Sequence, residues 1–304
     1  MSFLKKIILI LLLFLLTGCA PDASQSAGTK PDSVYIENKG SDTVVNLALA
    51  WAERYQQVKP AIRISVTGGG SGTGIASLIN KTVDIANASR EIKSEEIENA
   101  QKAGVNPYEI IIARDAIAVI VNPANPIDRL SLEQIAAIYN GSITNWSEVG
   151  GEDRPIVRLS RESNSGTHVY FLEAVVRLGN KNDKTIFSPN TLLLPSSEGI
   201  IAEVSDNPNA IGYDGLGYIT PNVKTLAISP KGSSEYYLPS IESVNNGTYP
   251  ISRDLYMYTD GSPRGEIKAY IDWILSDEAQ IIVSDLGFVP VIKIKGLANE
   301  SVSQ

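Results

Sequence analysis

Apolar residues along the first half of the chain recur at spacings that predict alternating strands and helices. Between Val44 and Val58, apolar side chains fall at positions i, i+3, i+4 and i+7, so that Leu47 and Trp51 share one helical face. The next apolar stretch, Ile62 to Val66, alternates with polar residues as a half-buried strand does. Strands that alternate with helices form a parallel α/β sheet, whose ligands bind at the carboxyl ends of the strands. We therefore expect an α/β fold with its ligand site at that edge.

Two longer apolar runs predict strands that leave one lobe and enter another. The run from Ile110 to Val121 is long for a strand and has polar residues at its centre. The run from Tyr249 to Tyr258 predicts a second crossing. We expect two lobes, with the first at 34–113 plus 253–296 and the second at 114–252.

The start of the chain has the pattern of an export signal. Lys5 and Lys6 precede the apolar run from Ile7 to Leu16, which is too short to span a bilayer. The sequence Leu-Thr-Gly-Cys that ends at Cys19 resembles the bacterial lipobox, which implies cleavage after residue 18 and lipid attachment to the Cys19 sulfur. A chance cysteine after a plain signal is the alternative. Residues 19–33 predict a flexible tether, and we expect the mature protein outside the cytoplasm, anchored to a bacterial membrane.

Composition and charge exclude several classes of function. The chain has 26 basic and 34 acidic residues, and loss of Lys5 and Lys6 with the signal leaves 24 against 34, or −10. With this acidic balance and no basic run beyond the signal, nucleic acid is excluded as a partner. Cys19 is the only cysteine and His168 the only histidine, so we expect no internal disulfide and no multi-histidine metal site. An anion site in such a chain must be local and built from oriented N–H groups.

The stretch from Ser160 to Thr167 predicts such a local anion site. It lies between a short apolar strand and an amphipathic run from Val169 to Leu178, so it ends at the start of a helix, where backbone N–H groups favour an anion. Ser165 and Thr167 add hydroxyl groups, Gly166 permits close approach to the backbone, and Arg161 offers a planar fork of charged donors. The alternative is an ordinary capped helix with a surface arginine.

Three further loops in the first half show the same pattern. Ser41, Asp42 and Thr43 precede the first helix. One polar side chain is enough to cap a helix N-terminus, so three in a row suggest a further role. Ser71 lies in the glycine run 68–74, which lacks the lysine of a P-loop and the last glycine of a nucleophile elbow. A turn without a ligand is the alternative there. Ser89 ends a third strand, and all four loops fit the same edge of the sheet.

The ordered set of motifs resembles the PstS-type phosphate-binding lipoproteins of bacterial phosphate ABC transporters. The matching segments follow the order of that family, at 40–43, 70–72, 82–85, 143–146, 161–167, 210–213 and 250–251. The resemblance implies a two-lobed periplasmic-binding-protein fold of type II, with phosphate enclosed between the lobes. It also implies a non-enzymatic receptor that uses no cofactor and delivers phosphate to ABC permease subunits. We expect a monomer.

The resemblance also implies the residues of the site. It assigns phosphate contacts to Ser41, Asp42, Thr43 and Ser71 in the first lobe, and to Arg161, Ser165, Gly166 and Thr167 in the second. At Ser89, many members of the family have an aspartate that accepts the phosphate proton and repels sulfate. Asp42 is our candidate for a substitute acceptor and Glu162 the second. The alternative is that Asp42 only caps its helix and that Glu162 pairs with Arg161.

Three other functions remain open on the sequence. A receptor for another tetrahedral oxyanion, such as sulfate or molybdate, fits the same loops, and Ser89 keeps it open. A secreted hydrolase would use Ser71 or Ser165 with His168, although no elbow motif is present. An anion sensor or adhesion subunit without a transport role would bind the anion in the same way.

Overall fold

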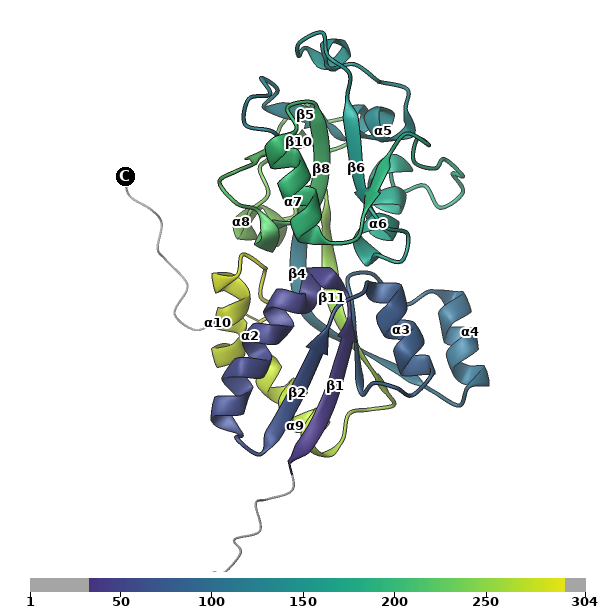
Figure 1. Ribbon diagram of the computed structural model, residues 1–304, viewed down its shortest axis with the longest axis vertical. Helices are drawn as coiled ribbons and strands as arrows, with labels where there is room; N and C mark the ends of the chain where they lie inside the picture. The colour runs from purple at the N-terminus through teal and green to yellow at the C-terminus, as the bar shows by residue number, and fades with distance from the viewer. Residues whose placement is uncertain (1–32, 293–304) are drawn as a thin grey trace, which may run out of the picture. The chain divides into compact units, whose positions relative to one another are not determined.

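The computed structural model describes residues 33–292 of the 304-residue chain. The predicted signal, the lipidation site at Cys19 and residues 19–32 of the predicted tether lie outside the described residues. From Val34 onward the described chain forms one compact unit. The predicted two-lobed α/β architecture is confirmed, and each lobe has its own helices (Figure 1). Each lobe also has its own hydrophobic core.

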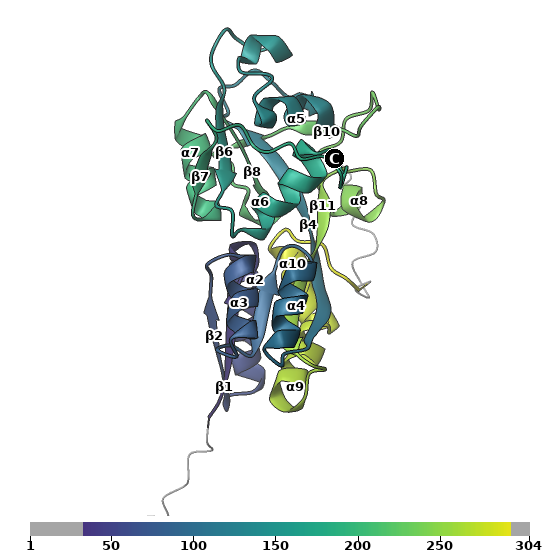
Figure 2. The same cartoon turned by 90° about the vertical axis from the view of Figure 1, so that its right-hand side faces the viewer.

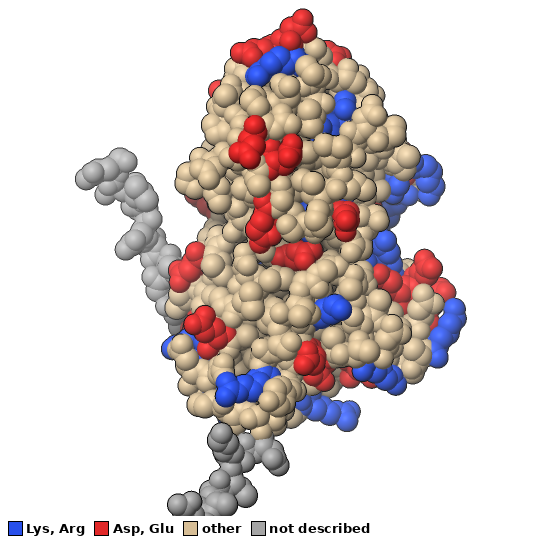
Figure 3. Space-filling view, viewed as in Figure 1, with Lys and Arg blue, Asp and Glu red and all other residues tan. Residues whose placement is uncertain are grey.

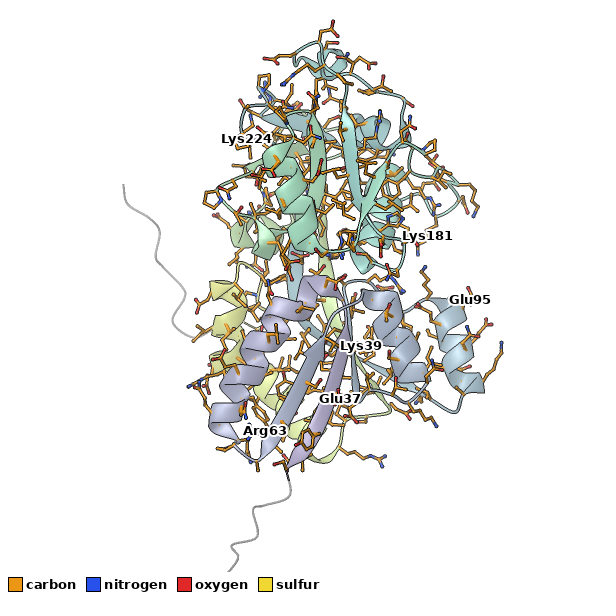
Figure 4. All side chains as sticks on the ribbon, viewed as in Figure 1. Glu37, Lys39, Arg63, Glu95, Lys181 and Lys224 are labelled. Atoms are coloured by element: carbon orange, nitrogen blue, oxygen red, sulfur yellow. The ribbon has the colours of Figure 1, made fainter. Side chains whose placement is uncertain are left out.

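The first lobe contains most of the elements that the apolar pattern predicts. Its strands and helices are β1 (Val34–Gly40), α2 (Asp42–Val58), β2 (Ile62–Thr67), α3 (Ser71–Ile79), β3 (Ile85–Ala88), α4 (Ser94–Lys102), α9 (Gly265–Ile274) and α10 (Asp277–Asp285). The apolar face predicted for α2 is buried, with Leu47 and Trp51 fully inside. Burial alternates along β1, and the labelled side chains of Glu37 and Lys39 lie on its more exposed positions (Figure 4).

The second lobe has shorter elements. They are β5 (Arg129–Ser131), α5 (Leu132–Asn140), η1 (Trp146–Val149), β6 (Val157–Arg161), α6 (Gly166–Phe171), η2 (Leu172–Val176), β7 (Leu192–Leu194), α7 (Ser197–Asp206), β8 (Ala210–Gly215), η3 (Leu216–Tyr218), β9 (Lys224–Thr225), β10 (Ala227–Ser229) and α8 (Ile241–Asn245). The helix predicted over the amphipathic run after Thr167 is interrupted, because α6 ends at Phe171 and continues as the π-helical turn η2.

Two strands connect the lobes, as predicted. Strand β4 (Pro107–Val121) pairs with β11 (Ser252–Asp260) as far as Ala116, and from Ile117 onward it pairs with β8 of the second lobe. Figures 1 and 2 show β4 and β11 between the two lobes. The C-terminal segment also contacts both lobes, since Phe288 packs in a first-lobe core and Val289 in a second-lobe core.

The sheet is mixed, so the prediction of a parallel sheet is wrong for the connecting strands. The strand order is β2-β1-β3-β11-β4-β8-β6-β7, with β9 also on β4. Pairing is parallel among β1, β2 and β3 and among β6, β7 and β8, whereas β4 and β11 pair antiparallel with their neighbours. The parallel strands of each lobe set the edge at which the predicted loops lie. Among residues 33–292, no helix combines the length and apolar character that crossing a bilayer requires.

Candidate functional site

Six buried hydroxyl side chains gather where the loops after four parallel strands meet. They are Ser41 and Thr43 after β1, Ser71 after β2, Ser89 after β3, and Ser165 and Thr167 after β6. We call these six residues the hydroxyl cluster. Three helices, α2, α3 and α6, begin in these loops, so their first backbone N–H groups lie beside the hydroxyl groups.

Ser89 joins the hydroxyl groups of the first lobe. The Ser41 Oγ donates a hydrogen bond to the Ser89 Oγ at 2.9 Å, and the Ser71 Oγ lies 3.3 Å from the same atom. The backbone N–H of Ser89 donates to the Ser71 Oγ at 3.0 Å. Ser41 occupies the cap position of α2 but makes no side-chain capping bond, so its hydroxyl serves the hydroxyl cluster instead.

The two lobes meet directly at the hydroxyl cluster. The Oγ1 atoms of Thr43 and Thr167 are 3.0 Å apart and share a hydrogen bond. A Cβ placed on Gly166 would lie 2.3 Å from the Ser71 Oγ and 2.5 Å from the Ser89 Oγ, so a side chain at this position would push the lobes apart. Because these groups touch one another, a tetrahedral anion can reach them only when the lobes separate.

Arg161 and Asp42, which we predicted as separate ligands, form one ion pair across the lobes. The Arg161 Nη2 donates to the Asp42 Oδ2 at 2.7 Å, and the backbone N–H of Gly69 donates to the Asp42 Oδ1 at 2.8 Å. Both carboxylate oxygens of Asp42 are therefore engaged, and neither caps its helix. Glu162 is exposed, and the alternative that it pairs with Arg161 is wrong, because Asp42 and Asp214 are the carboxylates beside that guanidinium.

The other Arg161 donors bind the second lobe. Its Nη1 donates to the Ser197 Oγ at 2.8 Å and lies 3.8 Å from the Asp214 Oδ2, while its Nε and Nη2 donate to the carbonyl groups of Leu194 and Pro195. The Ser197 hydroxyl in turn donates to Asp214. Burial raises the pKa of Asp214 to about 6, although Arg161 and these hydrogen bonds oppose the shift.

A second buried arginine, which the sequence reasoning did not single out, contacts the hydroxyl cluster. The Arg253 Nη2 on β11 donates to the Thr167 Oγ1 at 2.9 Å and to the Thr43 Oγ1 at 3.3 Å, and its Nη1 donates to the Ser89 carbonyl at 2.9 Å. Asp115 on β4 pairs with it at 3.0 Å. Burial raises the pKa of Asp115, and Arg253 opposes that shift. The signal in the sequence was charge inside two long apolar strands.

His168 lies beside Ser160, and not beside Ser71 or Ser165, the serines that the alternative hydrolase function would use. Its Nδ1 is 3.0 Å from the Ser160 Oγ, and its ring packs on Phe187. Ser71 bonds to Ser89, and the Ser165 Oγ accepts the N–H of Thr167. The structure therefore does not bring His168 together with either predicted nucleophile. Burial lowers the pKa of His168.

The surface charge matches an acidic protein with a local site. On the face shown in Figure 3, acidic and basic side chains are interspersed, without an extended basic patch. Within residues 33–292, no group of three or more histidine, cysteine or acidic side chains is placed to hold a metal ion.

Comparison with known sequences gives consistent matches over most of the chain. Residues 25–278 match the PBP superfamily domain. The phosphate-binding protein PstS of Pseudomonas aeruginosa is 31% identical over 288 residues, covering 89% of this chain and 86% of that protein. The protein of the same name from Bacillus subtilis is 30% identical over 303 residues, covering 96% of both chains.

Solved structures give the same result. A Clostridium perfringens protein assigned as a phosphate ABC transporter substrate-binding protein, solved with bound phosphate, has a TM-score of 0.76 and 34% identity, covering 85% of this chain and 100% of that one. An ABC-type phosphate transport receptor from Vibrio cholerae has a TM-score of 0.66 and 29% identity, covering 84% and 99%. These matches confirm the type II two-lobed fold.

Proposed function

Because the chain belongs to the PBP superfamily and, within it, to the PstS-type phosphate-binding proteins, we propose that it binds inorganic phosphate between its lobes for ABC import. The protein is a receptor and not an enzyme in this proposal. It delivers phosphate to the permease subunits of an ABC transporter. It acts outside the cytoplasm as a monomer, tethered through a lipid on Cys19.

The observation that carries this proposal is the hydroxyl cluster contributed by both lobes. Its six side chains and the adjoining helix starts offer neutral donors from several directions, which suits an anion with four oxygen atoms. Gly166 allows the second-lobe backbone to approach Ser71 and Ser89 closely. We propose nine residues as the phosphate-contacting set: Ser41, Asp42, Thr43, Ser71, Ser89, Arg161, Ser165, Gly166 and Thr167.

The energetics of such a site allow tight binding. A hydrogen bond to a charged group contributes about 1.5–3 kcal/mol, and micromolar affinity needs only about 8 kcal/mol. The summed free energy of several such bonds exceeds the binding free energy of a micromolar complex. The excess offsets the cost of desolvating the anion and ordering the lobes. Because the donors come from both lobes, phosphate stabilises the closed arrangement selectively, and binding drives closure.

Equilibrium dialysis with radiolabelled phosphate tests the proposal. We expect one saturable site per chain, with unlabelled phosphate competing and sulfate and molybdate competing weakly at equal concentration. Absence of saturable phosphate binding would reject the proposal. Displacement by sulfate or molybdate at lower concentration than phosphate would show a receptor for another oxyanion.

A further inference from the structure

We propose that Asn164 and Tyr218 of the second lobe form a latch that holds the closed lobes together and sets how long bound phosphate is retained. This inference rests on the phosphate site proposed above and concerns the rate at which that site releases its ligand. Neither residue belongs to the phosphate-contacting set. Each bonds to backbone groups of a first-lobe loop that carries members of that set.

Asn164 binds the glycine run of the first lobe through two hydrogen bonds. Its backbone carbonyl accepts the N–H of Gly72 at 3.0 Å, and its side-chain Nδ2 donates to the carbonyl of Gly69 at 2.9 Å. These two glycines lie on either side of Ser71, whose hydroxyl belongs to the hydroxyl cluster. Asn164 therefore joins the second-lobe anion loop to the first-lobe loop that carries Ser71.

The shape of the glycine run suits this contact. Gly70 has a φ of +88°, which glycine adopts readily, and a Cβ there would lie 2.8 Å from the carbonyl oxygen of Asn164. A Cβ on Gly72 would lie 3.4 Å from the same oxygen. The lack of side chains at these two positions leaves room for the second-lobe loop. Contact with the other lobe thus accounts for two glycines of the run 68–74.

Tyr218 binds a second loop of the first lobe. Its hydroxyl donates to the backbone carbonyl of Asp42 at 2.5 Å. The ring of Tyr218 is buried in a second-lobe core with Ile120 and Leu159, so its position is fixed relative to that lobe. Because the acceptor is a backbone carbonyl, this bond does not compete with the Asp42 carboxylate for its bond to Arg161.

The latch acts on the release of phosphate and not on its capture. A bound anion can leave only after the lobes separate, because Thr43 and Thr167 meet directly at the site. Separation of the lobes breaks the bonds of Asn164 and Tyr218, which raises the barrier to release. An arriving anion meets open lobes in which these bonds are absent, so the association rate does not depend on them. The two residues therefore strengthen binding by slowing dissociation.

Phosphorus NMR of phosphate exchange, combined with calorimetric titration, tests the inference in five proteins. They are the unchanged protein, Asn164→Ala, Tyr218→Phe, the double variant of these two substitutions, and Asn190→Ala as the control. Tyr218→Phe removes only the hydroxyl group and keeps the packing of the ring. Asn190 is an exposed asparagine just before β7, at the end of that strand away from the hydroxyl cluster. The NMR exchange gives the dissociation rate, and its ratio to the calorimetric dissociation constant gives the association rate.

We expect phosphate to dissociate about fivefold faster from Asn164→Ala and from Tyr218→Phe, because each loses one hydrogen bond between the lobes. The double variant should release phosphate about twenty-fivefold faster, since the two bonds are made to different loops and their effects add. Association rates should stay within about twofold of the unchanged protein. Asn190→Ala should match the unchanged protein in both rates.

An unchanged dissociation rate in the double variant would overturn the latch and leave the proposed function standing. Slower association with unchanged dissociation would overturn it too, because Asn164 and Tyr218 would then act on capture. An equal acceleration in Asn190→Ala would show that the effect does not come from contact between the lobes. If the unchanged protein binds no phosphate, the proposed function fails, and the latch fails with it.

Discussion

Two buried arginine–carboxylate centres lie near the contact between the lobes, and they differ in what surrounds them. Arg161 bonds to Asp42, Ser197 and two carbonyl groups, so its donors are engaged by the protein itself. Arg253 has one carboxylate partner and shares two threonine hydroxyls that also bond to each other. The first arrangement joins the lobes, and the second links the connecting strands to the hydroxyl cluster.

The difference shows that the two buried arginines are bonded to the protein in different ways. A guanidinium bonded to several carboxylate and carbonyl acceptors holds them in place, and its removal leaves a buried carboxylate without its cation. A guanidinium bonded to rotatable hydroxyl groups can exchange those bonds for bonds to a ligand at small cost. The predictions below separate these two roles.

The largest expected effect is a loss of stability in Arg161→Gln. The substitution leaves Asp214 and Asp42 without their cation, and breaking a buried pair costs about 3–5 kcal/mol. Urea unfolding measures the change, with Arg54→Gln as the control, since the Arg54–Glu278 pair is on the surface and contributes about 0–1 kcal/mol. Equal destabilisation by the two substitutions would contradict the account.

Gly166→Ala tests whether the lobes must approach closely at the hydroxyl cluster for phosphate to bind. A Cβ there would lie 2.3 Å from the Ser71 Oγ, so the closed contact between Thr167 and Thr43 cannot form without displacement. We expect phosphate affinity to fall about a hundredfold, the loss of about two charged hydrogen bonds, with little change in unfolding.

Gly199→Ala is the matched control for this substitution. Its added Cβ would meet the Ser196 Oγ at 3.4 Å, an ordinary contact, in helix α7 away from the hydroxyl cluster. Undiminished phosphate binding by Gly166→Ala would show that close approach of the lobes is not needed for binding.

Asp214→Asn tests the electrostatics of the Arg161 centre through pH. Folded Asp214 holds its proton to about pH 6, whereas an unfolded aspartate releases it near pH 4, so the folded state binds more protons between these values. Asp214 therefore makes the protein less stable as pH rises through this window, by on the order of 1–3 kcal/mol. Denaturant unfolding at several pH values should show a flatter profile for Asp214→Asn and an unchanged one for the exposed Asp206→Asn. Identical profiles in both variants would show that Asp214 does not contribute to the pH dependence of stability.

The smallest effect is expected for Glu162→Gln. Glu162 is exposed, and the carboxylates beside Arg161 belong to Asp42 and Asp214. We expect phosphate affinity and its ratio to sulfate affinity to change by less than about twofold, as for most exposed charges. A marked gain in sulfate binding would instead support Glu162 as the proton acceptor.

The sequence predicted the local features of the fold well. Helix α2 and strand β2 follow from the spacing of apolar residues. Strand β4 was recognisable because its length indicates a strand that passes from one lobe into the other. The interruption of the helix at Leu172 was not predictable, because nothing in its apolar spacing distinguishes a π turn from a regular one.

The sequence pointed to the loops that the structure brings together, but not to the pairings between their residues. Glycine and hydroxyl residues at strand ends pointed to the loops that hold Ser41, Ser71 and Thr167, because their chemistry is local. The partner of Arg161 lies 119 positions away at Asp42, and Arg253 reaches Thr43 over 210 positions. Such pairings depend on how the lobes meet, which periodicity and motifs do not encode.

The central claim is that the two lobes together form a phosphate site, and calorimetric titration of the purified protein with phosphate and with sulfate tests it most directly. The account predicts one phosphate per chain with a dissociation constant that is micromolar or lower, corresponding to about 8 kcal/mol or more, and weaker binding of sulfate. No saturable binding at millimolar phosphate, or tighter binding of sulfate, would contradict it.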